Sequence, residues 1–289
     1  MNGILVLNKE KNMTSRDVVN EVCKKLGTRH IGHTGTLDPI ATGVLVLGIN
    51  DGCKIIDLLT SSNKTYEAEV CMGLETDTLD ITGNVLRKEE VNVTREKLEE
   101  VISKFPKKYE QVVPKYSAIH VNGKRLYEYA RDNIEVDLPK REVEIYSLKL
   151  LDIGNNTFKI EASVSKGTYI RSLIRDIGDM LGIPCTMQEL KRTKQGIFDI
   201  KDAYNLDEVN PDMDLISLSD ALLDYDRIIV PSELEEKINN GMVLDLPTNS
   251  DLILVLNKEN RLLAIYQRYD KDPKMMKPYK VFKEELWKN

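Results

Sequence analysis

The segment of this chain best suited to chemistry runs from Gly32 to Gly43 and reads Gly-His-Thr-Gly-Thr-Leu-Asp-Pro-Ile-Ala-Thr-Gly. Its one carboxylate, Asp38, lies among three glycines, which allow a backbone to approach another molecule closely. Such a carboxylate can act as a nucleophile or stabilise a developing positive charge. Asp-Pro also begins ordinary turns, so the spacing alone leaves a purely structural loop as the alternative.

Three other segments combine residues that can do chemistry. Residues 64–66 read Lys-Thr-Tyr at the start of a predicted strand, residues 165–171 read Ser-Lys-Gly-Thr-Tyr-Ile-Arg at a predicted strand-to-helix junction, and residues 190–198 read Leu-Lys-Arg-Thr-Lys-Gln-Gly-Ile-Phe. Each has an ordinary explanation when it is taken alone. Tyr66 is then an aromatic residue of a strand, and Arg171 is a surface charge in the first turn of a helix.

The pattern of apolar residues predicts the elements that must hold these segments. Strands are predicted at 4–7, 44–49, 64–72, 141–151 and 158–164, and helices at 15–26, 54–59, 95–105 and from Thr168 to Gly182. Residues 75–83 are polar and predict a loop. Strands and helices follow one another without a steady alternation, so we expect an α+β domain with a largely antiparallel mixed sheet flanked by helices.

The C-terminal part of the chain has a different pattern. Residues 202–226 are acidic and predict a peripheral or linking segment. Pro231 to Glu235 has the pattern of a capping box at a helix start, strands are predicted at 252–256 and 262–266, and the tail at 271–288 is rich in lysine. We therefore predict two domains, residues 1–228 and a small β-rich unit of residues 229–289.

Composition and charge bound the function. The 289 residues are 41% hydrophobic and 30% charged, with a net charge of −6, values typical of a soluble globular protein. Overall acidity argues against a polyanionic partner, but residues 104–141 hold nine Lys and Arg against five Asp and Glu, while residues 202–237 hold two against eleven. No apolar run approaches the roughly 18 residues that cross a membrane, and no signal peptide is visible, so we expect a cytoplasmic protein.

The sequence predicts neither a metal site nor a cofactor. The four cysteines are widely spaced and form no C-x-x-C pair. His30, His33 and Asp38 lie close together but lack the further ligands that a metal ion needs. The fingerprints of phosphate-binding loops and dinucleotide-binding folds are both missing.

Taken together, the four segments resemble those of bacterial TruB-type tRNA pseudouridine synthases, which isomerise the uridine at position 55 in the T loop. Residues 32–43 match the catalytic motif of that family, and residues 165–171 match its Lys-Gly-Thr-Tyr-Ile-Arg motif. Residues 114–118 and 122–131 match an RNA-gripping insertion, placed here at about 104–141. The resemblance covers about residues 3–200 and implies a pseudouridine synthase core followed by a small PUA-like C-terminal domain.

The resemblance also implies roles for single residues. Asp38 is the nucleophile, Arg171 holds it ionised and in place, and Tyr66 supports the extruded base and helps to remove the C5 proton. Tyr169 is a second active-site tyrosine, and His33 enters the RNA as the base leaves. RNA contacts are implied for Gly35, Thr36, Lys9, Lys64, Asp80, Lys115, Tyr116, Lys124, Arg125, Lys166 and Arg192.

The implied partner is tRNA, bound through its T-arm stem-loop by a monomer that needs no protein partner, metal or cofactor. The C-terminal unit is implied to contact the acceptor end. The chain departs from the family pattern at Glu10, which follows Lys9 in place of proline, at Ile40 and at Lys115, and none of these is a catalytic group. Two alternatives remain open: a guide-dependent relative that acts on other RNA, and an RNA-binding or tRNA-folding protein without catalysis.

Overall fold

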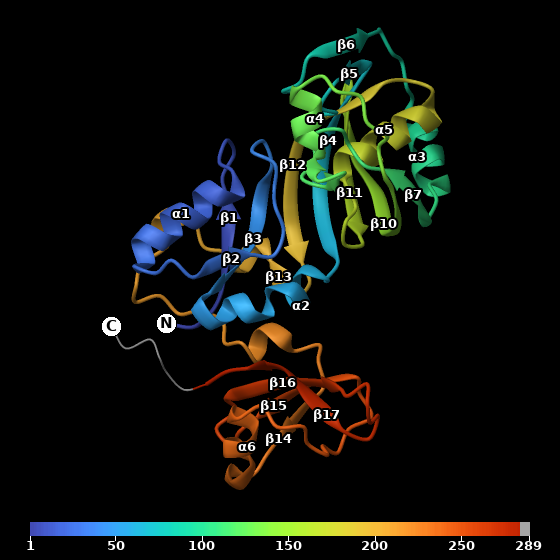
Figure 1. The fold of residues 1–289 in the computed structure, drawn as a ribbon. Helices are drawn as coiled ribbons and strands as arrows, with labels where there is room; N and C mark the ends of the chain where they lie inside the picture. The colour runs from blue at the N-terminus through green and yellow to red at the C-terminus, as the bar shows by residue number, and fades with distance from the viewer. Residues whose placement is uncertain (284–289) are drawn as a thin grey trace.

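A large mixed sheet forms the centre of the molecule (Figure 1). The computed structural model describes residues 1–283, and within them this sheet has nine strands in the order β1-β3-β12-β4-β11-β10-β7, with β2 paired to β3 and β13 to β12. The strands are β1 Gly3–Lys9, β2 Ile31–His33, β3 Thr42–Ile49, β4 Lys64–Met72, β7 Lys108–Val112, β10 Lys140–Ile153, β11 Thr157–Val164, β12 Cys185–Gln195 and β13 Phe198–Asp199. Every pair is antiparallel except β12 with β3, which confirms the predicted sheet.

Strands β1 and β3 are apolar almost throughout because both of their faces are covered. Val6 and Val46 belong to one core, whereas the alternating residues Leu7 and Leu47 belong to another. The second core includes Val18 of the first helix. The strand that follows the Asp38 loop is therefore fixed from both sides.

Helices lie at both ends of the large sheet, and the last helix packs on the small C-terminal sheet (Figure 1). They are α1 Ser15–Leu26, α2 Ile56–Thr60, α3 Arg95–Lys104, α4 Leu126–Arg131, α5 Ile170–Leu181 and α6 Glu235–Asn239, with 3-10 turns η1 Asn50–Ile55, η2 Ile200–Asp202, η3 Leu206–Glu208, η4 Asp220–Leu222 and η5 Ser232–Leu234. Within residues 1–283, no helix has the length and apolar content needed to span a membrane.

Helix α5 begins two residues later than the sequence predicts. Tyr169 has extended backbone angles, φ −97° and ψ 115°, so it stands just before the helix. The predicted end is confirmed, because Gly182 adopts the left-handed conformation at φ 76° that favours glycine after a helix. Arg171 consequently lies in the first turn of α5.

The polar stretch at 75–83, predicted as a loop, lies in a small hairpin. Its strands are β5 Leu74–Thr76 and β6 Val85–Lys88. The prediction missed β6 because all four of its residues are exposed, so no alternation of apolar residues marks it. The turn between the strands is closed by the Asp77 carboxylate, which accepts a hydrogen bond from the backbone of Asn84 at 2.8 Å.

The predicted insertion begins inside the large sheet. Its first part, β7, is the outermost strand and pairs with β10. Only the chain after Val112 stands apart from the sheet, as the two-residue strands β8 His120–Val121 and β9 Lys124–Arg125 followed by α4. The basic residues of this region are therefore divided between a sheet edge and a free-standing hairpin.

A separate four-stranded sheet forms the lower end of the molecule in Figure 1. Its strands are β14 Arg227–Ile229, β15 Leu252–Leu256, β16 Leu262–Arg268 and β17 Met276–Val281, so the two strands predicted in this region are confirmed and the predicted boundary after residue 228 falls inside β14. The predicted capping box is wrong: Pro231 precedes η5, and no side chain caps that turn or α6. The lysine-rich tail lies within the described residues only as far as residue 283.

The acidic segment 202–226 packs closely against the large sheet, which corrects its predicted peripheral place. Ile216 forms an antiparallel bridge to Ile4, and Tyr204 forms a parallel bridge to Leu7. Apolar residues of this segment, of β1 and of the small sheet form one shared core, which includes Val6, Leu222, Leu254 and Phe282. The small sheet is thus joined to the rest of the protein by buried apolar surface.

Candidate active site

A cleft of about 510 Å³ opens beside Asp38, a volume typical of ligand sites. Its walls come from residues 34–38, the start of β4, the free-standing hairpin and the junction before α5. Of the residues predicted for the site, the cleft is lined by Gly35, Thr36, Asp38, Lys64, Tyr66, Tyr116, Lys166, Tyr169, Arg171 and Arg192. Segments that lie far apart in the sequence therefore meet around one carboxylate.

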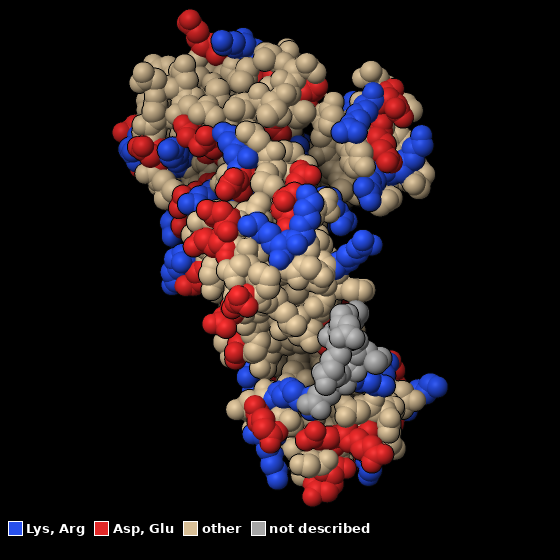
Figure 2. Space-filling model, turned by 90° about the vertical axis from the view of Figure 1, so that its left-hand side faces the viewer, with Lys and Arg blue, Asp and Glu red and all other residues tan. Residues whose placement is uncertain are grey.

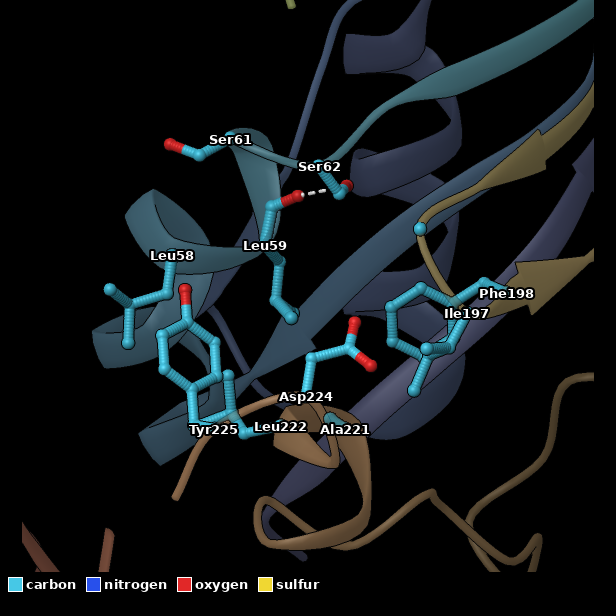
Figure 3. A pocket seen from close by; sticks show the side chains of 11 residues that line it. Leu58, Leu59, Ser61, Ser62, Ile197, Phe198, Ala221, Leu222, Asp224 and Tyr225 are labelled. Carbon is cyan, nitrogen blue, oxygen red and sulfur yellow. Dashed lines mark hydrogen bonds between the residues drawn. The ribbon is translucent and has the colours of Figure 1, made fainter. Parts of the chain in front are cut away.

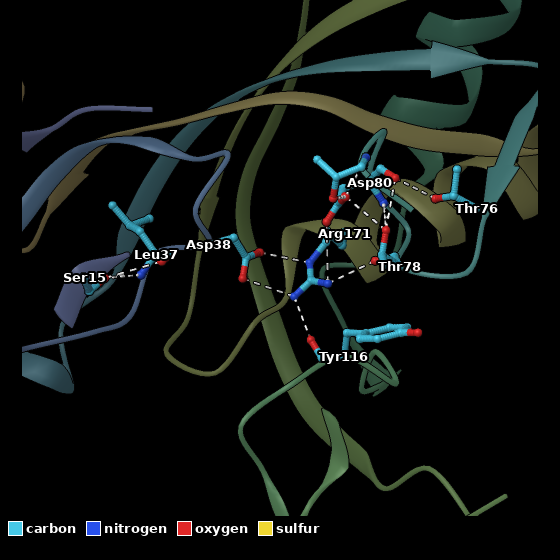
Figure 4. A network of polar contacts seen from close by, with 9 residues as sticks. Ser15, Leu37, Asp38, Thr76, Thr78, Asp80, Tyr116 and Arg171 are labelled. Carbon is cyan, nitrogen blue, oxygen red and sulfur yellow. Dashed lines mark hydrogen bonds and ion pairs between the residues drawn. The ribbon is translucent and has the colours of Figure 1, made fainter. Parts of the chain in front are cut away.

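Asp38 and Arg171 form a two-bond ion pair (Figure 4). The Arg171 Nε lies 3.0 Å from Asp38 Oδ2, and its Nη2 donates to Oδ1 at 3.3 Å. The Arg171 side chain is 7% exposed, whereas that of Asp38 is 35% exposed. This side-on geometry fixes the plane of the carboxylate and leaves it open toward the cleft.

Further contacts hold the guanidinium of Arg171 (Figure 4). Nη1 donates to the carbonyl of Thr78 at 3.0 Å, and Nη2 donates to the carbonyl of Tyr116 at 3.0 Å. Nη1 also lies 3.9 Å from Asp80 Oδ2. One buried cation therefore joins the catalytic loop, the β5–β6 turn and the insertion.

Asp80 is predicted to contact RNA, but it does not line the cleft. Its side chain is 8% exposed, and its Oδ1 accepts hydrogen bonds from the Thr78 hydroxyl and the backbone of Thr82, each at 3.0 Å. It lies behind Arg171, away from the cleft lining, so the geometry fits support of the guanidinium and not contact with RNA. We call Asp38, Asp80 and Arg171 the ion-pair network.

Opposing effects set the pKa of Asp38. Burial is the largest and raises it above the usual value, and the charge of Asp80 acts in the same direction. The nearby charges of Arg171 and Lys9 lower the pKa and so offset part of the increase. The ionised state of this carboxylate thus depends on the cations beside it.

The loop that carries Asp38 is held by hydrogen bonds from its own backbone. Leu37 N donates to the Ser15 hydroxyl at 2.9 Å at the start of α1, and Ala41 N donates to the Asp38 carbonyl at 3.0 Å. Gly43 closes the loop at φ 98°, where a Cβ would lie only 2.2 Å from the Arg192 carbonyl. The third glycine of the motif is therefore required by backbone conformation and close packing.

Three cations predicted to contact RNA are instead buried around this loop. The Lys9 ammonium, 1% exposed, donates to the carbonyls of Glu10 at 2.7 Å, Met13 at 2.6 Å and Pro39 at 3.3 Å. Burial lowers the pKa of Lys9 to about 8. Its hydrogen bonds are used within the fold, which leaves it no access to a phosphate.

The other two buried cations line the cleft wall. Arg192, 1% exposed, donates to the carbonyls of Val44 at 2.7 Å and Gly35 at 3.1 Å. Lys64, 8% exposed, donates to the carbonyls of Thr60 at 3.0 Å and Ser62 at 2.7 Å, and burial lowers its pKa to about 8. We call Lys9, Lys64 and Arg192 the carbonyl-held cations.

Two tyrosines line the same cleft as the ion pair. Tyr66, 7% exposed, projects from β4, where the predicted alternation of buried residues is confirmed. Tyr169 stands before α5, and its backbone N donates to Gln111 Oε1 at 2.8 Å. Burial raises the pKa of the Tyr169 phenol, which favours the protonated form.

The free-standing hairpin supplies exposed cations beside aromatic rings. Arg125 and Arg131 lie 5.9 Å and 5.2 Å from the ring of Tyr127, which lines the cleft, and Lys124 lies 5.9 Å from that of Tyr129. These positions suit contact with a phosphate backbone. Figure 2 shows that basic and acidic side chains are interspersed over the face it presents, so the positive charge is local.

Three other predicted RNA-contact residues differ in their placement. Lys166 lies at the cleft wall, where its Nζ donates to the Ser61 hydroxyl at 3.4 Å. Lys115 lines a separate hollow beside Glu135. His33 ends β2, next to the cleft-lining Thr34; burial lowers its pKa, and its Nδ1 is buried without a hydrogen-bond partner in the described part of the chain.

A second pocket, of about 180 Å³, lies away from Asp38 between α2, the β12–β13 turn and η4 (Figure 3). Its walls are mostly apolar, with Leu59, Phe198 and Leu222 among them. It includes the carboxylate of Asp224, but among the described residues no Lys, Arg or His lines it. Of the two pockets, the larger cleft is therefore the one in which a carboxylate meets a buried cation.

Sequence reasoning missed several residues that position the site. Ser15 binds the catalytic loop, Thr78 accepts from Arg171, and Gln111 binds the residue before α5. Only Ser15 carries a local signal, because it stands at the start of the helix predicted at 15–26. Within residues 1–283, no group of three or more His, Cys, Asp or Glu side chains is arranged to hold a metal ion.

Two family models match the sequence. The TruB family pseudouridylate synthase N-terminal domain matches residues 23–170, and the tRNA pseudouridylate synthase B C-terminal domain matches residues 171–234. The chain is 42% identical to tRNA pseudouridine synthase B of Bacillus cytotoxicus over 97% of each chain. It is 39% identical to the protein of the same name from Geobacillus thermodenitrificans, over 98% of this chain and 100% of the relative.

Solved structures share the fold at lower identity. A chain of an H/ACA RNP bound to a substrate RNA containing 2′-deoxyuridine gives a TM-score of 0.73 at 20% identity, over 97% of this chain and 85% of that one. A chain of a Cbf5-Nop10-Gar1 complex gives 0.71 at 21% identity, over 98% and 84%. These likenesses concern the fold of both the large and the small sheet.

Proposed function

The chain belongs to the TruB family of pseudouridylate synthases, and from this premise we propose that it isomerises uridine to pseudouridine at position 55 in the T loop of tRNA. The observation that carries the proposal is the two-bond pair of Asp38 and Arg171 inside a cleft that also holds Tyr66 and Tyr169. The relatives at about 40% identity are tRNA pseudouridine synthases by name, which supports tRNA as the substrate.

The reaction breaks the bond between N1 of the base and C1′ of the ribose and joins C5 to C1′. The proton at C5 leaves and N1 gains one, so the atoms of uridine are all retained and no water is consumed. Asp38 can add to C6 of the base, attack C1′, or remove a ribose proton to give a glycal. All three routes require an ionised carboxylate, which the Arg171 guanidinium supports.

The target base must leave its stack before Asp38 can reach it. Tyr66 lines the cleft beside Asp38 and supplies a ring on which the extruded base can rest, while its hydroxyl can help to remove the C5 proton by accepting it as its own proton passes on to water. Tyr169 closes the same cleft from the start of α5. His33 ends β2 next to the cleft-lining Thr34, and in this proposal it enters the space that the base leaves.

The insertion and the small sheet contact the parts of the tRNA that lie outside the cleft. Lys124 and Arg125 are exposed on the free-standing hairpin and bind phosphates of the T arm, with the salt dependence that such contacts bring. The small PUA-like unit contacts the acceptor end. The protein acts as a monomer in the cytoplasm, without a guide RNA or a protein partner.

The test is incubation of the protein with a T-arm stem-loop transcript alone, followed by chemical mapping of pseudouridine. We expect modification at position 55 only. Asp38→Asn should lower the rate by about 10³-fold or more while the affinity for the RNA changes little, because the substitution removes a charge needed in the transition state.

The outcome separates the alternatives. Product formed only after a guide RNA and other proteins are added would place this chain with guide-dependent relatives. Binding and refolding of the transcript without product would indicate a non-catalytic RNA-folding protein. Turnover by Asp38→Asn at the wild-type rate would refute the role of the carboxylate.

A further inference from the structure

Helix α5 carries Arg171 in its first turn, yet none of its own side chains caps that turn. The backbone N–H groups at a helix start have no partner inside the helix, so a buried start needs one from elsewhere. Here the N–H of Tyr169 donates to Gln111 Oε1 at 2.8 Å. Gln111 lies on β7 and is 1% exposed, so the cap of the catalytic helix comes from a strand 58 residues earlier.

The other end of the Gln111 amide is also occupied. Its Nε2 donates to the Tyr109 hydroxyl at 2.9 Å, and that hydroxyl donates to Asp176 Oδ2 at 2.8 Å. Because the single phenol proton is used on Asp176, the Tyr109 oxygen must accept from Gln111. The phenol therefore fixes the rotation of the amide and directs Oε1 at the helix start.

The same stretch of chain meets the helix start at two more points. Ser172 Oγ donates to the Val112 carbonyl at 2.8 Å. Five residues after Gln111, the Tyr116 carbonyl accepts from Arg171 Nη2 at 3.0 Å. The position of Arg171 relative to the catalytic loop is thus set by β7 and the chain that leaves it.

We propose that Gln111 is a positioning residue of the active site, whose amide places the start of α5 so that Arg171 meets Asp38 side-on. Gln111 is not among the residues that line the cleft, so it acts through Tyr169 and Arg171 and does not touch the RNA. The inference rests on the proposed function in one respect: the rate that is measured is the rate of uridine isomerisation.

Three variants separate the cap from general support of the fold. Gln111→Met has a similar shape and loses both polar ends. Gln111→Glu keeps an acceptor for the N–H of Tyr169 and loses the donor to Tyr109. Tyr109→Phe removes the phenol oxygen that orients the amide, keeps the ring against Phe105 and leaves the Gln111 acceptor available to the N–H of Tyr169.

Single-turnover rates and RNA affinities on the T-arm stem-loop are the main readouts. We expect Gln111→Met to react about tenfold more slowly or worse, whereas Gln111→Glu and Tyr109→Phe stay within about threefold of the wild type. The affinity for RNA should be unchanged in all three. The acid side of the rate profile should move to higher pH in Gln111→Met alone, because only there does the guanidinium leave Asp38.

A wild-type rate in Gln111→Met would overturn the proposal, as would rates in all three variants that follow their thermal stabilities. If Gln111→Met does not fold, the other two decide, because a loss of rate in both folded variants contradicts a role through the cap. A wild-type protein that forms no product on this RNA refutes the proposed function instead, and so the two failures are distinguishable.

Discussion

Two sets of charged side chains surround the Asp38 loop, and their charges are stabilised in different ways. In the ion-pair network, the Asp38 carboxylate meets the Arg171 guanidinium at 3.0 and 3.3 Å. The carbonyl-held cations Lys9, Lys64 and Arg192 instead donate to backbone oxygens. An ion pair changes the charge state of its partner, whereas a carbonyl fixes the path of the chain. Under the proposed function, the ion-pair network mainly tunes the ionisation of Asp38, and the carbonyl-held cations mainly shape the loop that presents it, with the Lys9 charge adding a smaller effect on the Asp38 pKa.

The largest effect should come from breaking the ion-pair network. We expect Arg171→Lys to lower the single-turnover rate by about 10²-fold, because an ammonium cannot make the two parallel bonds of a guanidinium. The pKa of Asp38 is already raised by burial, and a poorer cation will raise it further, so the acid side of the rate profile moves to higher pH. The measurement is the single-turnover rate between about pH 5 and pH 8.

Arg95→Lys is the matched control for that variant. Arg95 is exposed on α3 and pairs with Glu99 on the surface, so its replacement should leave the rate and its pH dependence unchanged. An acid limb that stays in place in Arg171→Lys would mean that the guanidinium does not govern the ionisation of Asp38.

A smaller effect on rate and a larger one on stability should follow from loss of Lys9. Lys9→Met leaves three carbonyls of the loop region without their donor, which we expect to destabilise the protein by about 1–3 kcal/mol. The rate should fall less than in Arg171→Lys, and the acid limb should move little. Denaturant unfolding at pH 7 provides the free energy.

Lys11→Met serves as the control for Lys9, since Lys11 is a surface lysine paired with Glu189. If Lys9→Met kept full stability but lost RNA affinity in a salt-dependent way, Lys9 would be an RNA contact, as the sequence predicts. The variant therefore decides between the sequence-based role and the one that the buried ammonium indicates.

The smallest effect concerns the pH dependence of stability. Burial lowers the pKa of Lys64 to about 8 from 10.5, so between these values the folded protein holds fewer protons than the unfolded chain. Stability should therefore rise with pH in this window, by about 1 kcal/mol between pH 8 and pH 9 from this lysine. The slope should fall by about half in Lys64→Met, because Lys9, whose pKa is also lowered to about 8, titrates in the same window. The slope should be kept in the exposed control Lys11→Met; equal slopes in all three proteins would contradict the burial of the Lys64 charge.

The local patterns of the sequence predict most of the large sheet and its helices. The run of buried alternate residues in β4 and the glycine after α5 both identify their elements correctly. Strand β6 is missed because it has no buried face, and the acidic segment is misplaced because its contacts, such as Ile216 with Ile4, join residues about two hundred positions apart. The spacing of apolar residues shows which face of a helix or strand is buried, but it does not show which distant segment packs against that face.

The sequence predicts some residues of the site better than others. Asp38, Tyr66, Tyr169 and Arg171 lie in one cleft, as the matched motifs imply. The RNA contacts predicted for the carbonyl-held cations do not fit their burial, because a lysine in a sequence gives no sign of whether its ammonium meets a carbonyl or a phosphate. Arg192 binds the carbonyl of Val44, 148 residues away, and only the folded chain reveals that partner.

The bridges from Ile216 to Ile4 and from Tyr204 to Leu7 have a consequence for biosynthesis. They cover the outer side of β1, which would otherwise present unpaired backbone groups to other chains. At about 5–20 residues per second, the ribosome needs roughly 10–40 s to deliver the covering segment after the first strand. During that interval the nascent chain carries an open sheet border, and chaperones that shield such borders should bind it most strongly before residue 216 emerges.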